Sequence, residues 1–180
     1  MARVTTGYKD HIAYVTLARP DKHNALDEEM VQAIIAGGRG AMFRSREGAE
    51  DRPLDARAAV RRRVRPGDVV VGITASGVTP FVAEALKTAG RRGARTILIT
   101  GHPRPAIPAT LKIVLAVGPE LLTGSTRLKT GTATKLVLNM LTLGAMVQVG
   151  KTYGNLMVDV RPTSRKLEAR AREIIRAMTR

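Results

Sequence analysis

The chain has no cysteine and no tryptophan, and only three tyrosines and two phenylalanines among its 180 residues. Without cysteine there is no disulfide bond and no thiolate chemistry, which agrees with a reducing compartment, and we expect a cytoplasmic protein. With so few aromatic residues, the core has to be built from Val, Ile, Leu, Ala and Met. Few aromatic side chains are left to stack on the bases of a nucleic acid.

The sequence also lacks a hydrophobic run of the ~18 residues that a transmembrane helix needs. Residues 1–15 contain no apolar stretch behind a basic start, so we expect neither a signal peptide nor a membrane partner. Apolar residues still make up 44% of the chain, which excludes wholesale disorder. The length suits one domain, or one domain with an appendage.

Negative charge is scarce, because 30 Lys and Arg residues face only 15 Asp and Glu residues, for a net charge of +15. The densest basic stretches are residues 61–66 ("RRRVRP") and 161–180, and aromatic residues are nearly absent beside them. A solvated, arginine-rich surface explains them better than a nucleic-acid patch, so we expect no nucleic-acid partner. The same positive field favours small anionic ligands.

The middle of the chain has the pattern of a βαβ unit. Residues 68–76 ("DVVVGITAS") form a continuous β-branched run that is typical of a buried parallel strand, and further strands are predicted at 94–101 and 111–118. A helix is predicted at 79–93, with Thr79 as its N-cap. Strand, helix and strand at this spacing predict a three-layer α/β fold with a parallel sheet.

The regions that flank this unit are less regular. Residues 11–17 are predicted to form a strand, followed by a turn and a helix. Residues 34–67 favour a glycine turn, a short helix, an acidic loop and an arginine-rich helix that ends at Pro66-Gly67. Residues 132–151 predict an apolar helix buried on most sides, by the core or by a partner subunit. Residues 164–178 predict an amphipathic helix with one apolar stripe.

The first strand of the βαβ unit leads into "TASGVTP" (74–80), at the strand end where parallel α/β sheets bind ligands. Thr74, Ser76 and Thr79 carry hydroxyls there. Gly77 lets the backbone approach a ligand closely, and the following helix directs its positive end to the same place. This is the chemistry of a phosphate cradle, although neither the P-loop nor the dinucleotide-binding pattern is present. The alternative is a set of ordinary helix caps.

A second polar loop, "TGSTRLKTGT" (123–132), directly precedes the long apolar helix. Its hydroxyls can bond to sugar hydroxyls or phosphate, and Arg127 or Lys129 can supply positive charge. The alternative is a capped loop in which Thr130 or Thr132 starts the helix and the cations are merely exposed. The residues alone leave both interpretations open.

Other chemistry-bearing residues form weaker patterns. Glu47, Glu50 and Asp51 make an acidic cluster that is either a solvated ion-pair face or, if one carboxylate is enclosed beside a substrate, a source of a general base. The three histidines are scattered and lack metal-ligand spacing, so we expect no metal. Ser76 has no evident His and Asp partners, which argues against a hydrolase triad.

Five stretches together resemble the N-acetylmuramic acid 6-phosphate etherases, which belong to the sugar isomerase (SIS) domain superfamily. They are "IIAGG", "EGAED", "DVVVGITASGVTPFV", "GPELLTGSTRLKTGTATKLVLNMLTLGAM" and "GKTYGNLMVDVRPTSRKLEARAREII", from about Ile34 to Ile175. The resemblance implies an αβα SIS-type fold and a cofactor-independent, homodimeric lyase of cell-wall (peptidoglycan) sugar recycling. Such a lyase eliminates D-lactate across C2–C3 of the amino-sugar 6-phosphate and then adds water to the unsaturated intermediate.

The resemblance also assigns roles to single residues. Glu50 in "EGAED" matches the family's proposed base, which removes the C2 proton. The loop that contains Ser76 matches the second phosphate-contacting loop of the SIS fold, and the loop that contains Ser125 is expected near the sugar, with contacts across the dimer. The predicted substrate- and phosphate-binding residues are Thr74, Ser76, Gly77, Thr79, Ser125, Thr126 and Lys129.

Residues 1–33 depart from the etherase pattern. "HIAYVTLARPDKHNALDEEMVQAI" instead resembles the N-terminus of the enoyl-CoA hydratases of the crotonase superfamily, where the backbone around Ala25 would contribute to an oxyanion hole. We therefore predict a crotonase-like segment (1–33) followed by a partial SIS domain (34–180) that lacks the first phosphate loop and the glutamate proposed as the acid. These departures imply impaired lyase activity. A non-catalytic sugar-phosphate-binding module is the alternative, and an enoyl-CoA hydratase fragment ranks lower.

Overall fold

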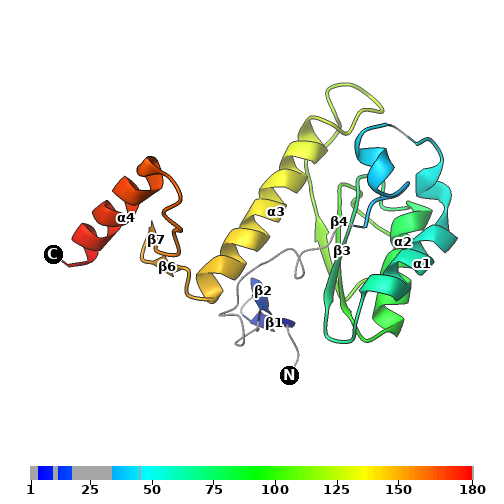
Figure 1. Ribbon diagram of the computed structural model, residues 1–180. Helices are drawn as coiled ribbons and strands as arrows, with labels where there is room; N and C mark the ends of the chain where they lie inside the picture. The colour runs from blue at the N-terminus through cyan, green and yellow to red at the C-terminus, as the bar shows by residue number, and fades with distance from the viewer. Residues whose placement is uncertain (1–3, 10–11, 18–33, 45, 180) are drawn as a thin grey trace.

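The computed structural model describes residues 4–9, 12–17, 34–44 and 46–179 (Figure 1). Its helices are η2 (Arg39–Met42) and η3 (Ala49–Asp51), both 3₁₀, and α1 (Pro53–Arg63), α2 (Pro80–Arg91), α3 (Lys129–Gln148) and α4 (Arg165–Met178). Its strands are β1 (Val4–Lys9), β2 (Ile12–Leu17), β3 (Val69–Thr74), β4 (Arg95–Thr100), β5 (Leu111–Val114), β6 (Thr152–Tyr153) and β7 (Leu156–Met157).

The centre of the molecule is a parallel sheet of three strands in the order β3-β4-β5. These strands lie within the three predicted ranges, so the parallel α/β prediction is confirmed. In the register of the sheet, Thr74 of β3 lies opposite Thr100 of β4. The two strands therefore end at the same level, and the loops that follow them leave the sheet side by side.

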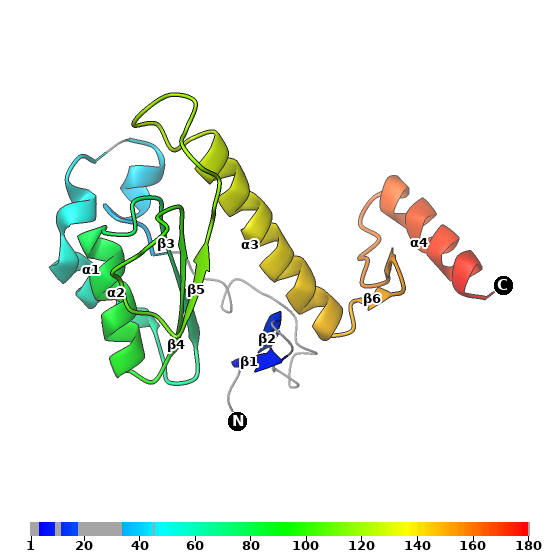
Figure 2. The ribbon, with the colours of Figure 1, turned by 180° about the vertical axis from the view of Figure 1, so that it is seen from behind.

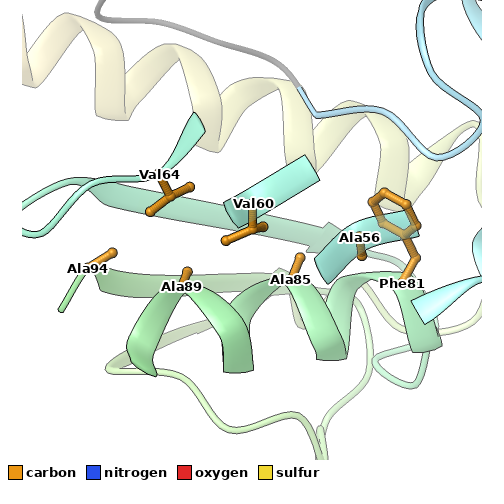
Figure 3. Packing of buried hydrophobic residues seen from close by; sticks show 7 residues of the cluster. All are labelled: Ala56, Val60, Val64, Phe81, Ala85, Ala89 and Ala94. Carbon is orange, nitrogen blue, oxygen red and sulfur yellow. The ribbon is translucent and has the colours of Figure 1, made fainter. Parts of the chain in front are cut away.

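Two helices cover one face of this sheet. α1 and α2 pack against each other through small side chains, among them Ala56, Ala85 and Ala89, which are buried (Figure 3). On the strand below, Gly72 permits the close approach of α2, since a Cβ atom there would lie 2.8 Å from side-chain atoms of Val82 and Leu86. α1 ends at Arg63, before the predicted Pro66-Gly67, because the backbone is already extended at the C-cap.

α3 covers the other face and completes the three-layer αβα fold (Figure 2). Its Ala133, Val137 and Leu141 pack on a cluster that includes Ile97 and Ile99 of β4. The expectation that this helix is buried on most sides is wrong within one chain. Only one side of α3 meets the sheet, and its buried residues are Thr130 and Ala145.

The strand predicted at 11–17 is confirmed as β2, which pairs with β1 in an antiparallel hairpin. This hairpin forms its own two-stranded sheet and adds no strand to the parallel one. β2 contacts α3, so the hairpin lies on the α3 side of the molecule (Figure 1). The helix predicted after this strand falls outside the described residues.

Beyond α3 the chain forms the β6–β7 hairpin and the amphipathic helix α4, which confirms the helix predicted at 164–178 (Figures 1 and 2). An ion pair of 2.6 Å between Lys151 Nζ and Asp159 Oδ2 joins the chain before the β6–β7 hairpin to the chain after it. Ser164 caps α4 by accepting a hydrogen bond from the N–H of Leu167 at 3.4 Å. None of the helices in the described part of the chain has the length and apolarity needed to cross a membrane.

Candidate functional site

Three hydroxyls gather at the carboxyl end of β3. Thr74 Oγ1 lies 2.7 Å from Thr79 Oγ1 and 3.2 Å from Ser76 Oγ, and the last two atoms are 3.4 Å apart. We call these three side chains the hydroxyl triangle. Thr74 is buried at its base, Thr79 is half-buried and Ser76 is exposed. Because each hydroxyl has one rotatable proton, the triangle can turn up to three donors toward an anion that replaces the bonds between them.

The first turn of α2 faces this triangle without a side-chain cap. Thr79 occupies the N-cap position, but its hydroxyl makes no cap hydrogen bond and is bonded to Thr74 instead. Pro80 at the first helical position has no N–H, and the other early N–H groups of a helix have no partner inside it. For Thr79, the interpretation as an ordinary helix cap is therefore wrong. The positive end of α2 remains available to an anionic ligand.

The loop after β4 is tied to the loop after β3 by one threonine. Thr100 Oγ1 donates to the carbonyl of Ala75 at 3.4 Å and accepts from the N–H of His102 at 3.1 Å. Gly77 has a φ of +72°, and a Cβ atom there would lie 2.9 Å from the Cβ of His102. In the sequence, His102 is one of three scattered histidines and carries no sign of this position. Because Thr74 pairs with Thr100 in the sheet, the loop that carries His102 lies beside the loop that carries Gly77. This strand register is the signal that could have indicated the position of His102.

The start of α3 reaches the same strand ends. Thr130 is buried, and a Cβ atom at Gly101 would lie 3.0 Å from its Cγ2 and 3.2 Å from its Oγ1. The loops that follow β3 and β4 and the first turn of α3 therefore meet at one edge of the sheet. This is the edge at which parallel α/β folds bind their ligands.

Glu120 caps α3, which is a role that the sequence analysis missed. Its carboxylate accepts hydrogen bonds from the N–H of Thr130 at 2.9 Å and from the N–H of Lys129 at 3.0 Å. The bond from Thr130 is the largest cause that lowers the pKa of Glu120. α3 begins at Lys129, one residue before Thr130, and the cap of the helix lies upstream in the chain.

The other polar residues of this loop bond within the loop. The ammonium of Lys129 donates to the carbonyl of Pro119 at 2.8 Å. The N–H of Ser125 donates to the carbonyl of Leu122 at 3.0 Å, and the carbonyl of Thr126 accepts from Gly131 at 2.9 Å. These bonds shape the loop beside the strand ends, while the predicted sugar contacts of Ser125, Thr126 and Lys129 stay predictions.

Glu50 lies on a separate element. It belongs to η3, which contacts α2, and its side chain is exposed. A cavity of about 630 Å³ opens beside η3, between residues 34–38 and α1, and Glu50 is not among its lining residues. Positively charged arginines and negatively charged carboxylates line this cavity together with apolar side chains. The structure brings the hydroxyl triangle and Gly77 together, and the role of Glu50 as a base stays a prediction.

An ion pair supports α2 behind the site. Arg57 Nε of α1 lies 2.7 Å from Glu84 Oε1 of α2, and the Thr88 hydroxyl donates to the same oxygen at 3.0 Å. The bond from Arg57 is the main cause that lowers the pKa of Glu84, whose side chain is 10% exposed. Within the described residues, no group of three or more His, Asp or Glu side chains is arranged to hold a metal ion.

Comparison with known proteins agrees with this architecture. The SIS domain family matches residues 54–144, which include the hydroxyl triangle and most of α3. The glucokinase regulatory protein N-terminal SIS domain matches residues 8–90. Because this second match begins inside the segment 1–33, the division at residue 33 and the crotonase resemblance stay predictions.

Three curated proteins named N-acetylmuramic acid 6-phosphate etherase are similar to most of the chain. The one from Symbiobacterium thermophilum is 51% identical over 155 residues, which cover 84% of this chain and 52% of that protein. Those from Synechocystis sp. and Nostoc sp. are 54% and 53% identical over 154 residues, with 84% of this chain and 50% of each protein covered. The chain thus spans about half the length of these relatives. From its fold and from the family match over its centre, the chain belongs to the SIS domain family.

Proposed function

We propose that the chain binds an amino-sugar 6-phosphate and acts as a lyase of the N-acetylmuramic acid 6-phosphate etherase type. The observation that carries the proposal is the hydroxyl triangle at the uncapped start of α2. It lies in a chain about half of whose aligned residues are identical to those of proteins named for this activity. A cytoplasmic location and independence from cofactors belong to the same proposal.

Phosphate binding follows from the chemistry of the triangle. A phosphoryl dianion accepts hydrogen bonds from the hydroxyls of Thr74, Ser76 and Thr79 and from the free N–H groups of α2. Gly77 fits the turn between Ser76 and Thr79 because it has no side chain, and a Cβ atom there would collide with His102. The net charge of +15 attracts an anionic substrate from a distance.

The lyase step needs a base, a leaving group and water. Glu50 removes the C2 proton, the C3–O bond breaks, and D-lactate leaves; water then adds to the double bond. Ser125, Thr126 and Lys129 contact the sugar. The departing lactate oxygen needs a proton, and the resemblance assigns no glutamate of residues 1–33 as its source. We expect a reduced rate, because such general-acid help is typically worth about 10²–10⁴-fold.

The test measures D-lactate released from N-acetylmuramic acid 6-phosphate by the wild type, Ser76→Ala and Glu50→Gln. We expect slow release by the wild type, weaker substrate binding in Ser76→Ala, and retained binding without release in Glu50→Gln. Unchanged kinetics in both variants would refute the proposal. Asp51→Asn is the matched control for Glu50, because it removes the neighbouring exposed carboxylate on η3.

A second candidate is a non-catalytic sugar-phosphate-binding module. The observation that favours it is the place of Glu50, which is exposed on η3 and belongs to a different element from the hydroxyl triangle. Calorimetry separates the two functions. Binding of the sugar phosphate without any D-lactate release supports the module, and turnover at any rate above that of Glu50→Gln supports the lyase.

We also propose that the chain forms a homodimer through α3. Four apolar side chains form a stripe on this helix with successive spacings of four, three and four residues. They are Leu136, Met140, Leu143 and Val147, each at least 50% exposed. This is the spacing of a helix that packs against another helix. Light scattering should give a dimer for the wild type and a monomer for Leu143→Glu, while Leu54→Glu, which changes an exposed leucine on α1, remains a dimer.

A further inference from the structure

We propose that His102 contacts the phosphoryl group of the substrate, to which its Nε2–H donates a hydrogen bond. The inference rests on the proposed sugar-phosphate site at the hydroxyl triangle and adds to it a residue from the neighbouring strand. The loop after β4 would then take part in substrate recognition together with the loop after β3.

The first observation is the place of the ring. A Cβ atom at Gly77 would lie 2.9 Å from the Cβ and 3.4 Å from the Cγ of His102. The base of the imidazole therefore packs over the glycine that stands between Ser76 and Thr79. The residue is exposed, so its ring is open to a ligand at this end of the sheet.

The second observation is that the residue is anchored at two points. Its N–H donates to the Thr100 hydroxyl at 3.1 Å, and its Nδ1 accepts from the N–H of Arg104 at 3.2 Å. Thr100 is 1% exposed and also bonds to Ala75, so the anchor is part of the sheet end itself. Because both bonds hold His102 in the absence of a ligand, little conformational freedom is lost when it binds one.

The bond from Arg104 also determines which nitrogen carries the proton. A backbone N–H donates to Nδ1, so Nδ1 is unprotonated and the neutral ring carries its hydrogen on Nε2. The only ring nitrogen left for a ligand is thus a donor. A phosphoryl oxygen is an acceptor, and it matches a neutral Nε2–H in the same way that it matches the hydroxyls of the triangle.

Two substitutions separate donation from anchoring. His102→Gln places an amide N–H near the former Nε2, whereas His102→Asn places its carbonyl oxygen near Nδ1, where it can still accept from Arg104. We expect roughly tenfold weaker binding of N-acetylglucosamine 6-phosphate for His102→Asn, and binding within about twofold of wild type for His102→Gln. The melting temperatures of both variants should stay close to that of the wild type.

Calorimetric titration of this sugar phosphate measures the effect, and unphosphorylated N-acetylglucosamine serves as the control ligand. Equal affinity in His102→Asn and wild type would overturn the inference, and so would a loss confined to His102→Gln, which would mean that His102 only anchors its loop. A wild type that binds no sugar phosphate overturns the proposed function and this inference together. Binding that Ser76→Ala weakens and His102→Asn does not overturns this inference alone.

A second readout needs no ligand. The ¹⁵N chemical shifts of the imidazole of His102, assigned by their loss in His102→Gln, report which ring nitrogen is protonated. We expect a protonated Nε2 and an unprotonated Nδ1 at neutral pH. The opposite tautomer would leave Nε2 without a proton to donate and would contradict the inference.

Discussion

The loop after β3 and the loop before α3 reach the same edge of the sheet, but different partners hold their polar groups. In the first loop, hydroxyls bond to one another in the triangle of Thr74, Ser76 and Thr79. In the second, the carboxylate of Glu120 holds the helix N–H groups, and a carbonyl holds the ammonium of Lys129. Hydroxyls that bond to each other can turn to a ligand at little cost, whereas charged groups already bonded within their own loop must first give up strong partners.

Glycines at the two loops provide the largest expected contrast. Gly77 (φ +72°) and Gly124 (φ +86°) both have backbone conformations that favour glycine, but only Gly77 is crowded, by His102. Gly77→Ala should weaken sugar-phosphate binding at least about tenfold and destabilise the fold by about 2 kcal/mol, from strain and collision together. Gly124→Ala should cost about 1 kcal/mol from strain alone. Calorimetry measures the sugar-phosphate affinity of both variants, and thermal unfolding measures their stability. Equal affinity in the two variants would contradict the expected difference between the loops.

The helix behind the first loop depends on a nearly buried carboxylate. Glu84→Gln removes the charge that Arg57 and the Thr88 hydroxyl share, so we expect about 1–3 kcal/mol of destabilisation. Chemical denaturation measures it. The exposed Glu168 on α4 is the control, since Glu168→Gln removes a carboxylate that lies outside the three-layer core. A Glu84→Gln protein as stable as the control would show that the ion pair does not support α2.

The bridge between the two strand ends should give a smaller effect. Thr100→Val keeps the shape of a buried side chain but removes the hydroxyl that joins Ala75 to His102. We expect about 1–2 kcal/mol lower stability and a modest loss of phosphate affinity. If affinity fell as far as in Gly77→Ala, the bridge would matter as much to the site as the shape of the β3–α2 loop does.

The pH dependence of stability should be the smallest effect, and it has the same direction for the two carboxylates. Hydrogen bonds lower the pKa values of Glu84, from Arg57, and of Glu120, from Thr130. A lowered folded-state pKa adds stability above the unfolded-state pKa, and this stability is lost as the pH falls through the folded-state value. Glu120→Gln should therefore unfold at a lower temperature than the wild type at neutral pH, with a gap that narrows in acid. A gap that widens in acid would contradict the assigned bonds.

Much of the central fold was predictable from the sequence, because local patterns specify it. The β-branched run at 68–76 and the Thr-Pro start of the next helix predicted β3 and α2 to within about two residues. The start of α3 was not predictable in this way, because its cap, Glu120, lies nine residues before Lys129. His102 was missed for a related reason: its place depends on the register between two strands, which no local pattern reveals.

What covers α3 was not predictable, because a sequence shows that a helix is apolar and does not show whether the core or a partner subunit covers it. Leu136 and Met140 are exposed, although Val137 and Leu141 beside them pack on the sheet.

The candidate site was predicted in part from the sequence. The hydroxyls after β3 meet as expected from a strand end followed by a helix, whereas the environment of Glu50 depends on tertiary contacts that its own segment does not determine.

One calorimetric comparison decides whether the hydroxyl triangle binds phosphate. N-acetylglucosamine 6-phosphate and unphosphorylated N-acetylglucosamine are titrated into the wild type and Ser76→Ala. We expect the wild type to prefer the phosphorylated sugar and Ser76→Ala to lose roughly tenfold in affinity for that sugar alone, as for the loss of one hydrogen bond to a charged group. Equal affinity of both proteins for the sugar phosphate would contradict it.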